Sequence, residues 1–363
     1  MQGDFHYYAT YAAAYLAGAS HEESLAIAYS AQLVDHCTAT LLKKIGGPAS
    51  AATTQLTLEL ANSGADVFSL QSTTRIWASF HFLPYDLYAS IPKRTQMYMR
   101  KYRLVCHPNG ALLVDTVELA RGKGPQACGI AMHILADTWA HRYFAGTPSL
   151  VINNATDFYD LLRDEPIKFS HNPVGAEDIG KSRYINTVFQ SSESSIMNLG
   201  HGRAGHLPDY SFMKYRFLPA WDNYEAVVKD NPSDYYHAFC QMVYAMKCLR
   251  GDGADFHVDA YDEEAVAPWR DEIMEILTTR TPSAEAEWKR FGEKLSGQTI
   301  EAFSTAKYEQ EYISADAKEK PDSFLGRFIS AATAQKSMVT SKIFKSKSLL
   351  AGYCIDFRDL IKR

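Results

Sequence analysis

Several signatures of specialised proteins are missing from this chain of 363 residues. No stretch reaches the ~18 uninterrupted apolar residues that a membrane-spanning helix needs. The cysteines form no CxxC pair and no disulfide-like spacing, which favours free, mostly buried thiols in a reducing compartment. A Walker loop, a dinucleotide fingerprint and a Ser-His-Asp elbow do not occur in a suitable context either. The cysteines are Cys37, Cys106, Cys128, Cys240, Cys248 and Cys354.

Positive charge is also in short supply, since the formal net charge is −5. This balance argues against a surface that coats nucleic acid, although a local basic groove remains compatible with it. No Lys or Arg precedes the apolar N-terminal segment, and Asp4 and His6 stand where the apolar region of a signal peptide would begin. We therefore expect this segment to belong to the folded protein and the protein to be cytoplasmic as synthesised, with export by a signal-independent route left open.

Three ligand-type side chains interrupt an otherwise apolar helix predicted over residues 127–144, ACGIAMHILADTWAHRYF. His133, Asp137 and His141 are spaced at i, i+4 and i+8, which spreads them over about 80° of one helix face. A buried carboxylate between two imidazoles needs partners, because an uncompensated buried charge costs several kcal/mol. The partner is either a metal ion or, in the plainer alternative, the two histidines themselves, hydrogen-bonded to the aspartate in the core.

Two further helices are expected at the N-terminus, over about 5–17 and 21–37. A glycine follows the first helix, and the second begins with the Ser-x-x-Glu pattern of a capping box. Asp4 and His6 would then lie at the start of the first helix and Asp35 at the end of the second. Side chains in these places can converge on a shared site.

Histidines recur in two other segments. The stretch 75–86, RIWASFHFLPYD, has the aromatic and β-branched character of an extended segment, and it contains His81. A lone histidine between aromatic residues is more often a core residue than a ligand. LGHGRAGHLPDYSF carries His201, His206 and Asp209 among glycines, a composition that lets backbone and ligands approach a site closely.

The rest of the chain predicts a mainly α fold in a single domain spanning the whole chain. Apolar spacing of three and four indicates helices at 233–250 and 262–279, and residues 284–314 are expected to form another helix or two. Residues 145–199 lack periodicity and are expected to form a loop-rich flap across the site. The segment 321–363 is basic and indicates a solvated helical face or, more weakly, a contact with an anionic surface.

Taken in order, these residues resemble the zinc-dependent phospholipase C and single-strand-specific nuclease superfamily. The FHYYATY, HILADTWAH and GHGRAGHLPD blocks also look like those of an uncharacterised bacterial family. The first resemblance implies a multi-helix domain with two or three zinc ions in a cleft among the helices. The resemblance rests on Asp4, His6, Asp35, His81, His133, Asp137, His141, His201, His206 and Asp209.

Carried over by position, the resemblance also implies which residues bind each ion. In that superfamily the amino group of a processed N-terminal tryptophan binds metal, and here Asp4 would take its place. The central helix of the superfamily has five residues between its Asp and its second His, against three here, which suits a two-metal variant. The implied ligands are Asp35, His81, His133 and Asp137 for a first zinc, His141, His201 or His206, and Asp209 for a second, and Asp137 and His6 for a third.

The resulting functional prediction is a zinc-dependent hydrolase of phosphodiester bonds, with Asp35 and Asp137 as catalytic residues. The substrate could be a phospholipid, a nucleic acid or a small phosphodiester. Two other classes remain open. One is a helical di-metal redox protein, although such bundles prefer paired Glu-x-x-His motifs. The other is a non-catalytic, partner-binding protein with a structural zinc cluster.

Overall fold

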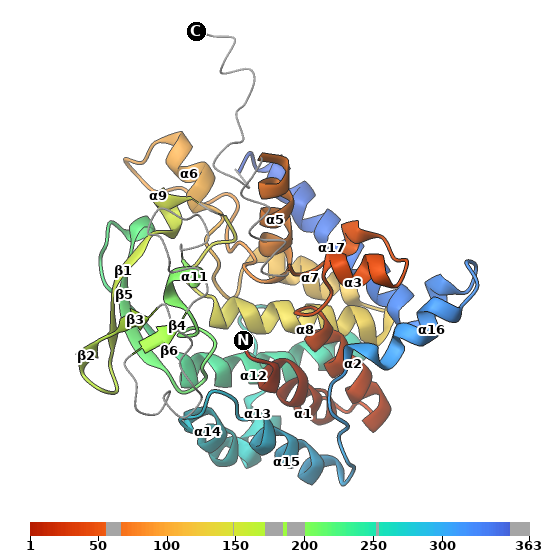
Figure 1. The fold of residues 1–363 in the computed structure, drawn as a ribbon. Helices are drawn as coiled ribbons and strands as arrows, with labels where there is room; N and C mark the ends of the chain where they lie inside the picture. The colour runs from red at the N-terminus through yellow and green to blue at the C-terminus, as the bar shows by residue number, and fades with distance from the viewer. Residues whose placement is uncertain (56–66, 148, 171–183, 187–199, 252–253, 349–363) are drawn as a thin grey trace.

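The computed structural model describes residues 1–363 except 56–66, 148, 171–183, 187–199, 252–253 and 349–363. Helices form most of the chain, and a small four-stranded sheet lies at one side of them (Figure 1). The mainly helical class predicted from the sequence is confirmed, whereas the sheet was not expected. Within the described residues, no helix is both long enough and apolar enough to cross a membrane.

The N-terminal helices follow the expected order. Ser20 caps the second of them by accepting a hydrogen bond from the backbone N–H of Glu23 at 3.2 Å. That helix ends at Leu33, earlier than expected, so Asp35 lies in the turn that follows it. The elements are the π-helix η1 (Asp4–Ala9), α1 (Thr10–Leu16), α2 (His21–Leu33), α3 (Ala39–Lys44) and the 3-10 turn η2 (Ala49–Ala51).

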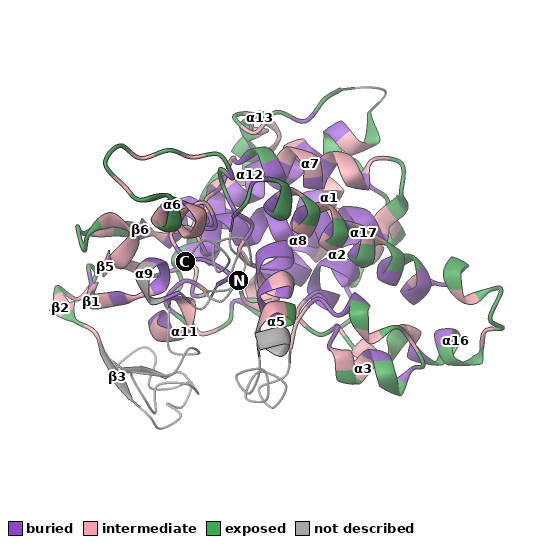
Figure 2. Cartoon of the chain, turned by 90° about the horizontal axis from the view of Figure 1, so that it is seen from above, coloured by how far each residue is buried: buried purple, intermediate pink, exposed green. Residues whose placement is uncertain are grey.

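Helix α8 (Gly124–Ala140) lies at the centre of the fold. Every side chain from Gln126 to Ala140 is buried, as Figure 2 shows. Its contact with α2 requires a glycine, because a Cβ at Gly129 would lie 2.3 Å from the carbonyl oxygen of Ile27. The helices packed against α8 include α2, α5 (Val67–Phe80), α7 (Ala111–Ala120), α12 (Asn231–Arg250) and α17 (Phe324–Lys345).

The prediction of an extended segment at 75–86 is wrong over its first half, because residues 75–80 belong to α5. Ile76 and Phe80 are spaced like residues on one helix face, and both are buried. Packing of α5 against α8 and α17 outweighs the strand preference of its aromatic and β-branched residues. His81 follows the last residue of α5, and α6 (Gln96–Tyr102) comes later in the chain.

The four-stranded sheet is antiparallel, with strand order β2-β1-β5-β6, and it has a small hydrophobic core of its own that includes Phe158 and Phe217. Part of the expected loop at 145–199 is therefore strand. Much of the remainder lies outside the described residues, so the flap stays a prediction. The elements are α9 (Leu150–Asn153), β1 (Ala155–Asp160), β2 (Glu165–Pro166), the parallel pair β3 (Lys168–Ser170) and β4 (Tyr184–Asn186), α11 (His201–Ala204), β5 (Lys214–Pro219), η3 (Ala220–Asp222) and β6 (Val227–Asp230).

The C-terminal half is helical, as predicted, but more broken. The helix expected at 262–279 is divided by a 3-10 turn. The one or two helices expected at 284–314 are two, joined by an irregular connection. The elements after α12 are α13 (Glu263–Val266), η4 (Ala267–Trp269), α14 (Arg270–Thr278), α15 (Glu285–Ser296), η5 (Thr305–Tyr308), α16 (Glu309–Ser314), η6 (Lys320–Asp322) and α17.

The basic C-terminal segment is only partly a solvated face. Lys336 on α17 is half-buried and donates to the carbonyl oxygen of Ala52 at 2.9 Å, and Lys342 pairs with Asp115. Lys345 is exposed. The last fifteen residues, 349–363, lie outside the described part of the chain. Contact of this segment with an anionic surface therefore stays a prediction.

Candidate metal centre

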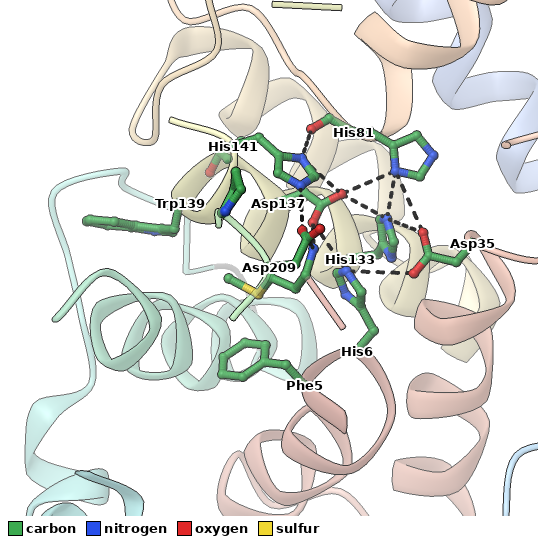
Figure 3. Close-up of polar contacts among 12 residues, drawn as sticks. Phe5, His6, Asp35, His81, His133, Asp137, Trp139, His141 and Asp209 are labelled. Atoms are coloured by element: carbon green, nitrogen blue, oxygen red, sulfur yellow. Dashed lines mark hydrogen bonds and ion pairs between the residues drawn. The ribbon is translucent and has the colours of Figure 1, made fainter. Parts of the chain in front are cut away.

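Polar side chains from several parts of the chain meet beside α8 (Figure 3). α8 supplies His133 and Asp137, and His141 is the residue that ends it. The other side chains come from η1, from the turn after α2, from the end of α5 and from the region of α11. Three groups each bring one ligand-type atom per residue within 4.8 Å of the others: His6, His133 and Asp137; Asp35, His81 and His133; and His141, His201 and Asp209.

The carboxylate of Asp137 is at the centre of the cluster and is 1% exposed. Its Oδ2 lies 3.2 Å from both His133 Nε2 and His81 Nδ1. Its Oδ1 lies 3.2 Å from His6 Nε2 and accepts a hydrogen bond from the amino group of Met1 at 2.9 Å. The two oxygens therefore face different sets of partners, as a carboxylate that bridges two cations would.

Asp35 closes the outer side of this cluster. Its oxygens lie 3.8 Å from His81 Nδ1 and 3.9 Å from both His133 Nε2 and His6 Nε2. The side chain of Asp35 is 30% exposed, against 1% for that of Asp137. Asp35 is therefore the carboxylate of this cluster that solvent or a substrate can reach.

The third group lies toward the sheet. Asp209 Oδ1 is 3.2 Å from His201 Nε2 and 3.4 Å from His141 Nε2. The ring of Phe82 stacks on that of His141 with centroids 4.8 Å apart. The amino group of Met1 lies 3.3 Å from Asp209 Oδ1 and also contacts Asp137, so it stands between the two carboxylates.

The separations among these atoms match a metal site. Nitrogen and oxygen ligands about 2.0–2.1 Å from a tetrahedral zinc ion lie roughly 3.3 Å from one another. The contacts of Asp137 with His6, His81 and His133 are each 3.2 Å, and those of Asp209 are 3.2 and 3.4 Å. The groups therefore have the dimensions to hold a divalent ion.

The hydrogen bonds of the outer ring nitrogens indicate which ring nitrogens direct a lone pair into the site. His133 Nδ1 lies 2.9 Å from the carbonyl oxygen of Ala31, and His81 Nε2 lies 2.9 Å from that of Thr53. His141 Nδ1 is 2.6 Å from the carbonyl oxygen of His81. Since a carbonyl can only accept, the N–H of each neutral ring is assigned to the outer nitrogen. The inner nitrogens then direct lone pairs toward carboxylate oxygens, an arrangement that a cation between them would stabilise.

His6 supports the same conclusion. It is fully buried, and neither ring nitrogen has a hydrogen-bond partner among the described residues. Its ring stacks on that of His133 with centroids 3.8 Å apart. Burial, with the charges of His133 and the Met1 amino group, lowers the pKa of His6 to about 4. A buried, neutral imidazole with an unused lone pair is suited to metal binding.

The carboxylates of the centre remain ionised. Burial alone would raise the pKa of Asp137, but His141, the Met1 amino group, His133 and His6 together hold it well below its usual range. The pKa of Asp209 is held low in the same way. Although burial opposes the charge of the Met1 amino group, the carboxylates raise its pKa to about 11. The centre thus keeps the negative charge that a divalent ion requires.

The metal-free protein should lose stability as the pH falls from about 6.5 to about 4. In this interval the unfolded chain binds a proton at His6 and the folded chain does not, because burial lowers the folded pKa to about 4. Lower pH therefore favours the unfolded state, by at most about 3 kcal/mol for this group. Urea unfolding of chelator-treated protein across these pH values measures the effect. His6→Gln should show a shallower dependence, and equal slopes for the two proteins would refute the assignment.

Two predicted ligands lie outside the groups. Asp4 belongs to none of the three groups. Its Oδ1 accepts from the N–H of Phe5 and its Oδ2 from that of Ala284, both at 2.7 Å. Both oxygens are thus engaged with backbone, and the Met1 amino group occupies the place assigned to Asp4. His206 has a side chain that is 50% exposed, and its Nδ1 lies 3.9 Å from Asp209 Oδ2. His201 is the histidine that joins His141 and Asp209.

The structure also shows participants that sequence reasoning missed. The amino group of Met1 was overlooked because Asp4 was expected in its place. Two of the three carbonyl groups that accept from the histidines belong to Ala31 and Thr53, whose side chains are not ligands, and the third belongs to His81 itself; no sequence pattern would identify these backbone acceptors. Lys229 and Asn231 contact the chain segments that carry His141 and Asp209. Their only signal was a polar stretch, KDNPSD, at the start of a predicted helix.

Comparison with known protein families identifies a match that covers most of the chain. The model of a family of unknown function (DUF6765) matches residues 1–343. No curated protein and no solved structure matches the chain significantly. The matched range includes all the residues of the three groups.

Proposed function

The chain belongs to this family of unknown function (DUF6765), and we propose that it is a zinc-dependent hydrolase of phosphodiester bonds. The observation that carries the proposal is the arrangement around Asp137. Three imidazoles approach the two oxygens of one buried carboxylate at 3.2 Å, and a further two-histidine, one-aspartate group lies next to it. Adjacent cation sites of this kind suit reactions in which charge develops on a phosphoryl group.

The donor set favours a transition metal ion, for which we propose zinc, over calcium or magnesium. Imidazole and carboxylate together suit zinc, whereas sites for calcium or magnesium are built mainly from oxygen ligands. Asp35, His81, His133 and Asp137 would hold one ion, and His141, His201 and Asp209 a second. His6 and Asp137 would hold a third, beside the Met1 amino group.

Asp35 is the residue best placed to handle the nucleophile. When bound, such ions supply an acidified water and neutralise charge on phosphorus. Burial raises the pKa of Asp35, but His133, His6 and His81 lower it overall, so the carboxylate is ionised and can accept a hydrogen bond from water. Its exposure lets it orient a water molecule from the open side. Phe82, stacked on His141, provides an apolar wall at the third group.

Two measurements on the purified protein test the proposal. Mass-spectrometric metal analysis should find at least two zinc ions per chain, and a chromogenic phosphodiester should be hydrolysed in a chelator-sensitive reaction. Zinc without hydrolysis of any lipid, nucleotide or small phosphodiester would favour a structural zinc cluster in a partner-binding protein. Iron or manganese with redox activity would favour a di-metal redox protein.

A matched pair of variants locates the second ion. His201→Ala should release one ion per chain, because His201 Nε2 is 3.2 Å from Asp209 Oδ1. His206→Ala should keep the full metal content, because its side chain is half-exposed and farther away. The reverse result would exchange the two histidines in the proposed site.

A further inference from the structure

A short segment outside the metal centre contacts both parts of the chain that carry the third metal group. It runs from the end of β6 into the first turns of α12. Its polar side chains reach backbone carbonyl groups next to His141 and on either side of Asp209. We refer to Lys229, Asn231, Asp234 and Tyr235 as the bracket.

Lys229 holds the end of α8. Its side chain is fully buried, and its Nζ donates to the carbonyl oxygen of Trp139 at 2.7 Å. In a continuing helix the N–H of Tyr143 would donate to this carbonyl oxygen, but here it donates to the carbonyl oxygen of Cys106 instead. A cation at a helix C-terminus is favourable, and this one lies two residues before His141.

Asp234 joins Lys229 to the chain just after His141. Its carboxylate pairs with the Lys229 ammonium, and it accepts from Arg142 Nη1 at 3.5 Å. Arg142 is the residue that follows His141. Lys229 therefore contacts the backbone before this ligand, and Asp234 contacts the guanidinium of the residue after it.

Asn231 and Tyr235 hold the turn that carries Asp209. The fully buried amide of Asn231 donates to the carbonyl oxygens of Leu207 at 2.7 Å and Tyr210 at 2.8 Å. The hydroxyl of Tyr235 donates to the carbonyl oxygen of Pro208 at 3.1 Å. The backbone on both sides of Asp209 is thus fixed by side chains that also belong to the bracket.

We propose that the bracket is a positioning device that sets the distance between His141 and Asp209 and thereby the metal affinity of the group they form with His201. The inference rests on the proposed metal site. The two ligands come from different parts of the fold, one from the helical core and one from the sheet side. Partners outside the ligand shell commonly change metal affinity by about 10–100-fold. The bracket connects the two sides through the contacts described above.

Lys229→Met tests the inference with little change in side-chain volume. Chelator competition should show one ion per chain bound at least tenfold more weakly, with the other ions unaffected. The cobalt-substituted protein should lose the visible absorbance of one site. If the single variant does not fold because Asp234 is left buried without a partner, the double variant Lys229→Met/Asp234→Asn removes that charge. The metal affinity is then measured on the double variant. Lys294→Met is the control, because its exposed side chain pairs with Glu272 on α14.

A second comparison identifies the ion. Asp209→Asn should release the same ion, and adding Lys229→Met to it should cause no further loss. Folded Lys229→Met protein that keeps every ion at wild-type affinity would overturn the inference. Equal weakening of all ions would also overturn it, because the bracket would then act on general stability. Wild-type protein that binds no metal would instead refute the proposed function.

Discussion

Asp137→Asn should remove at least one metal ion per chain and lower phosphodiester hydrolysis by on the order of a thousandfold. The two carboxylate oxygens face separate partners, Oδ1 toward His6 and Oδ2 toward His81 and His133. An amide keeps the shape but carries one oxygen and no charge, and its N–H₂ would point at one of the two cation sites. Without the negative charge of the carboxylate, nothing at this position offsets the repulsion between the two neighbouring metal ions, so one ion should dissociate.

Metal content and rate should be measured on the same preparation, because a variant that loses only activity has a different cause. His107→Ala is the matched control. His107 is in a turn, where its Nδ1 lies 3.0 Å from the carbonyl oxygen of Pro108 and its Nε2 accepts from Arg142. The His107→Ala protein should retain its full metal content. His171→Ala is expected to do the same, although His171 lies outside the described residues. If Asp137→Asn keeps its full metal content, the assignment of the whole metal centre is wrong.

Gly129→Ala should destabilise the protein by about 3 kcal/mol or more, although alanine is normally the better helix residue. The added Cβ would lie 2.3 Å from the carbonyl oxygen of Ile27, 2.6 Å from Ser30 Cβ and 2.9 Å from the backbone nitrogen of Ala31. Two of these three atoms are backbone, so α2 must move away from α8. The carbonyl group of Ala31 orients His133, and its displacement should weaken metal binding as well.

Denaturant unfolding of metal-free protein and a metal titration separate the two effects. Gly47→Ala is the control. Its Cβ would meet the side-chain ends of Leu42 and Ile329 at 3.3 and 3.4 Å, which can shift, and the carbonyl oxygen of Leu42 at 3.4 Å, an ordinary van der Waals distance. Its cost should remain below about 1 kcal/mol. Wild-type stability in Gly129→Ala would show that α2 and α8 can separate freely, and the close packing would then have no role in placing His133.

Local sequence patterns predicted the helical parts of the centre well. The i, i+4, i+8 spacing of His133, Asp137 and His141 was sufficient to place them together, because helix geometry converts spacing into direction. The structure has all three at one site. Reasoning from local patterns failed for the residues just before His81, where aromatic composition suggested an extended segment and packing against α8 and α17 produced a helix.

Ligand identity within a cluster depended on the tertiary structure. His201 and His206 are chemically equal in sequence, and only the orientation of the turn places one of them 3.2 Å from Asp209 and leaves the other half-exposed. Asp4 was a reasonable candidate because it is close to His6 in sequence. Its carboxylate instead accepts from two backbone N–H groups, one of them at Ala284, far away in the chain.

By itself, the sequence determined a mainly helical chain with a polar stripe on a buried central helix, because periodicity and burial of polar groups are local properties. Only the tertiary structure decided which residues complete that stripe. Asp35, His81 and Asp209 lie in three distant segments, and their meeting depends on how α2, α5 and the sheet side pack around α8. The same packing provides the carbonyl groups that orient the histidines and the bracket that holds Asp209. These contacts are made by backbone and by long-range packing, for which the order of side chains along the chain contains no direct signal.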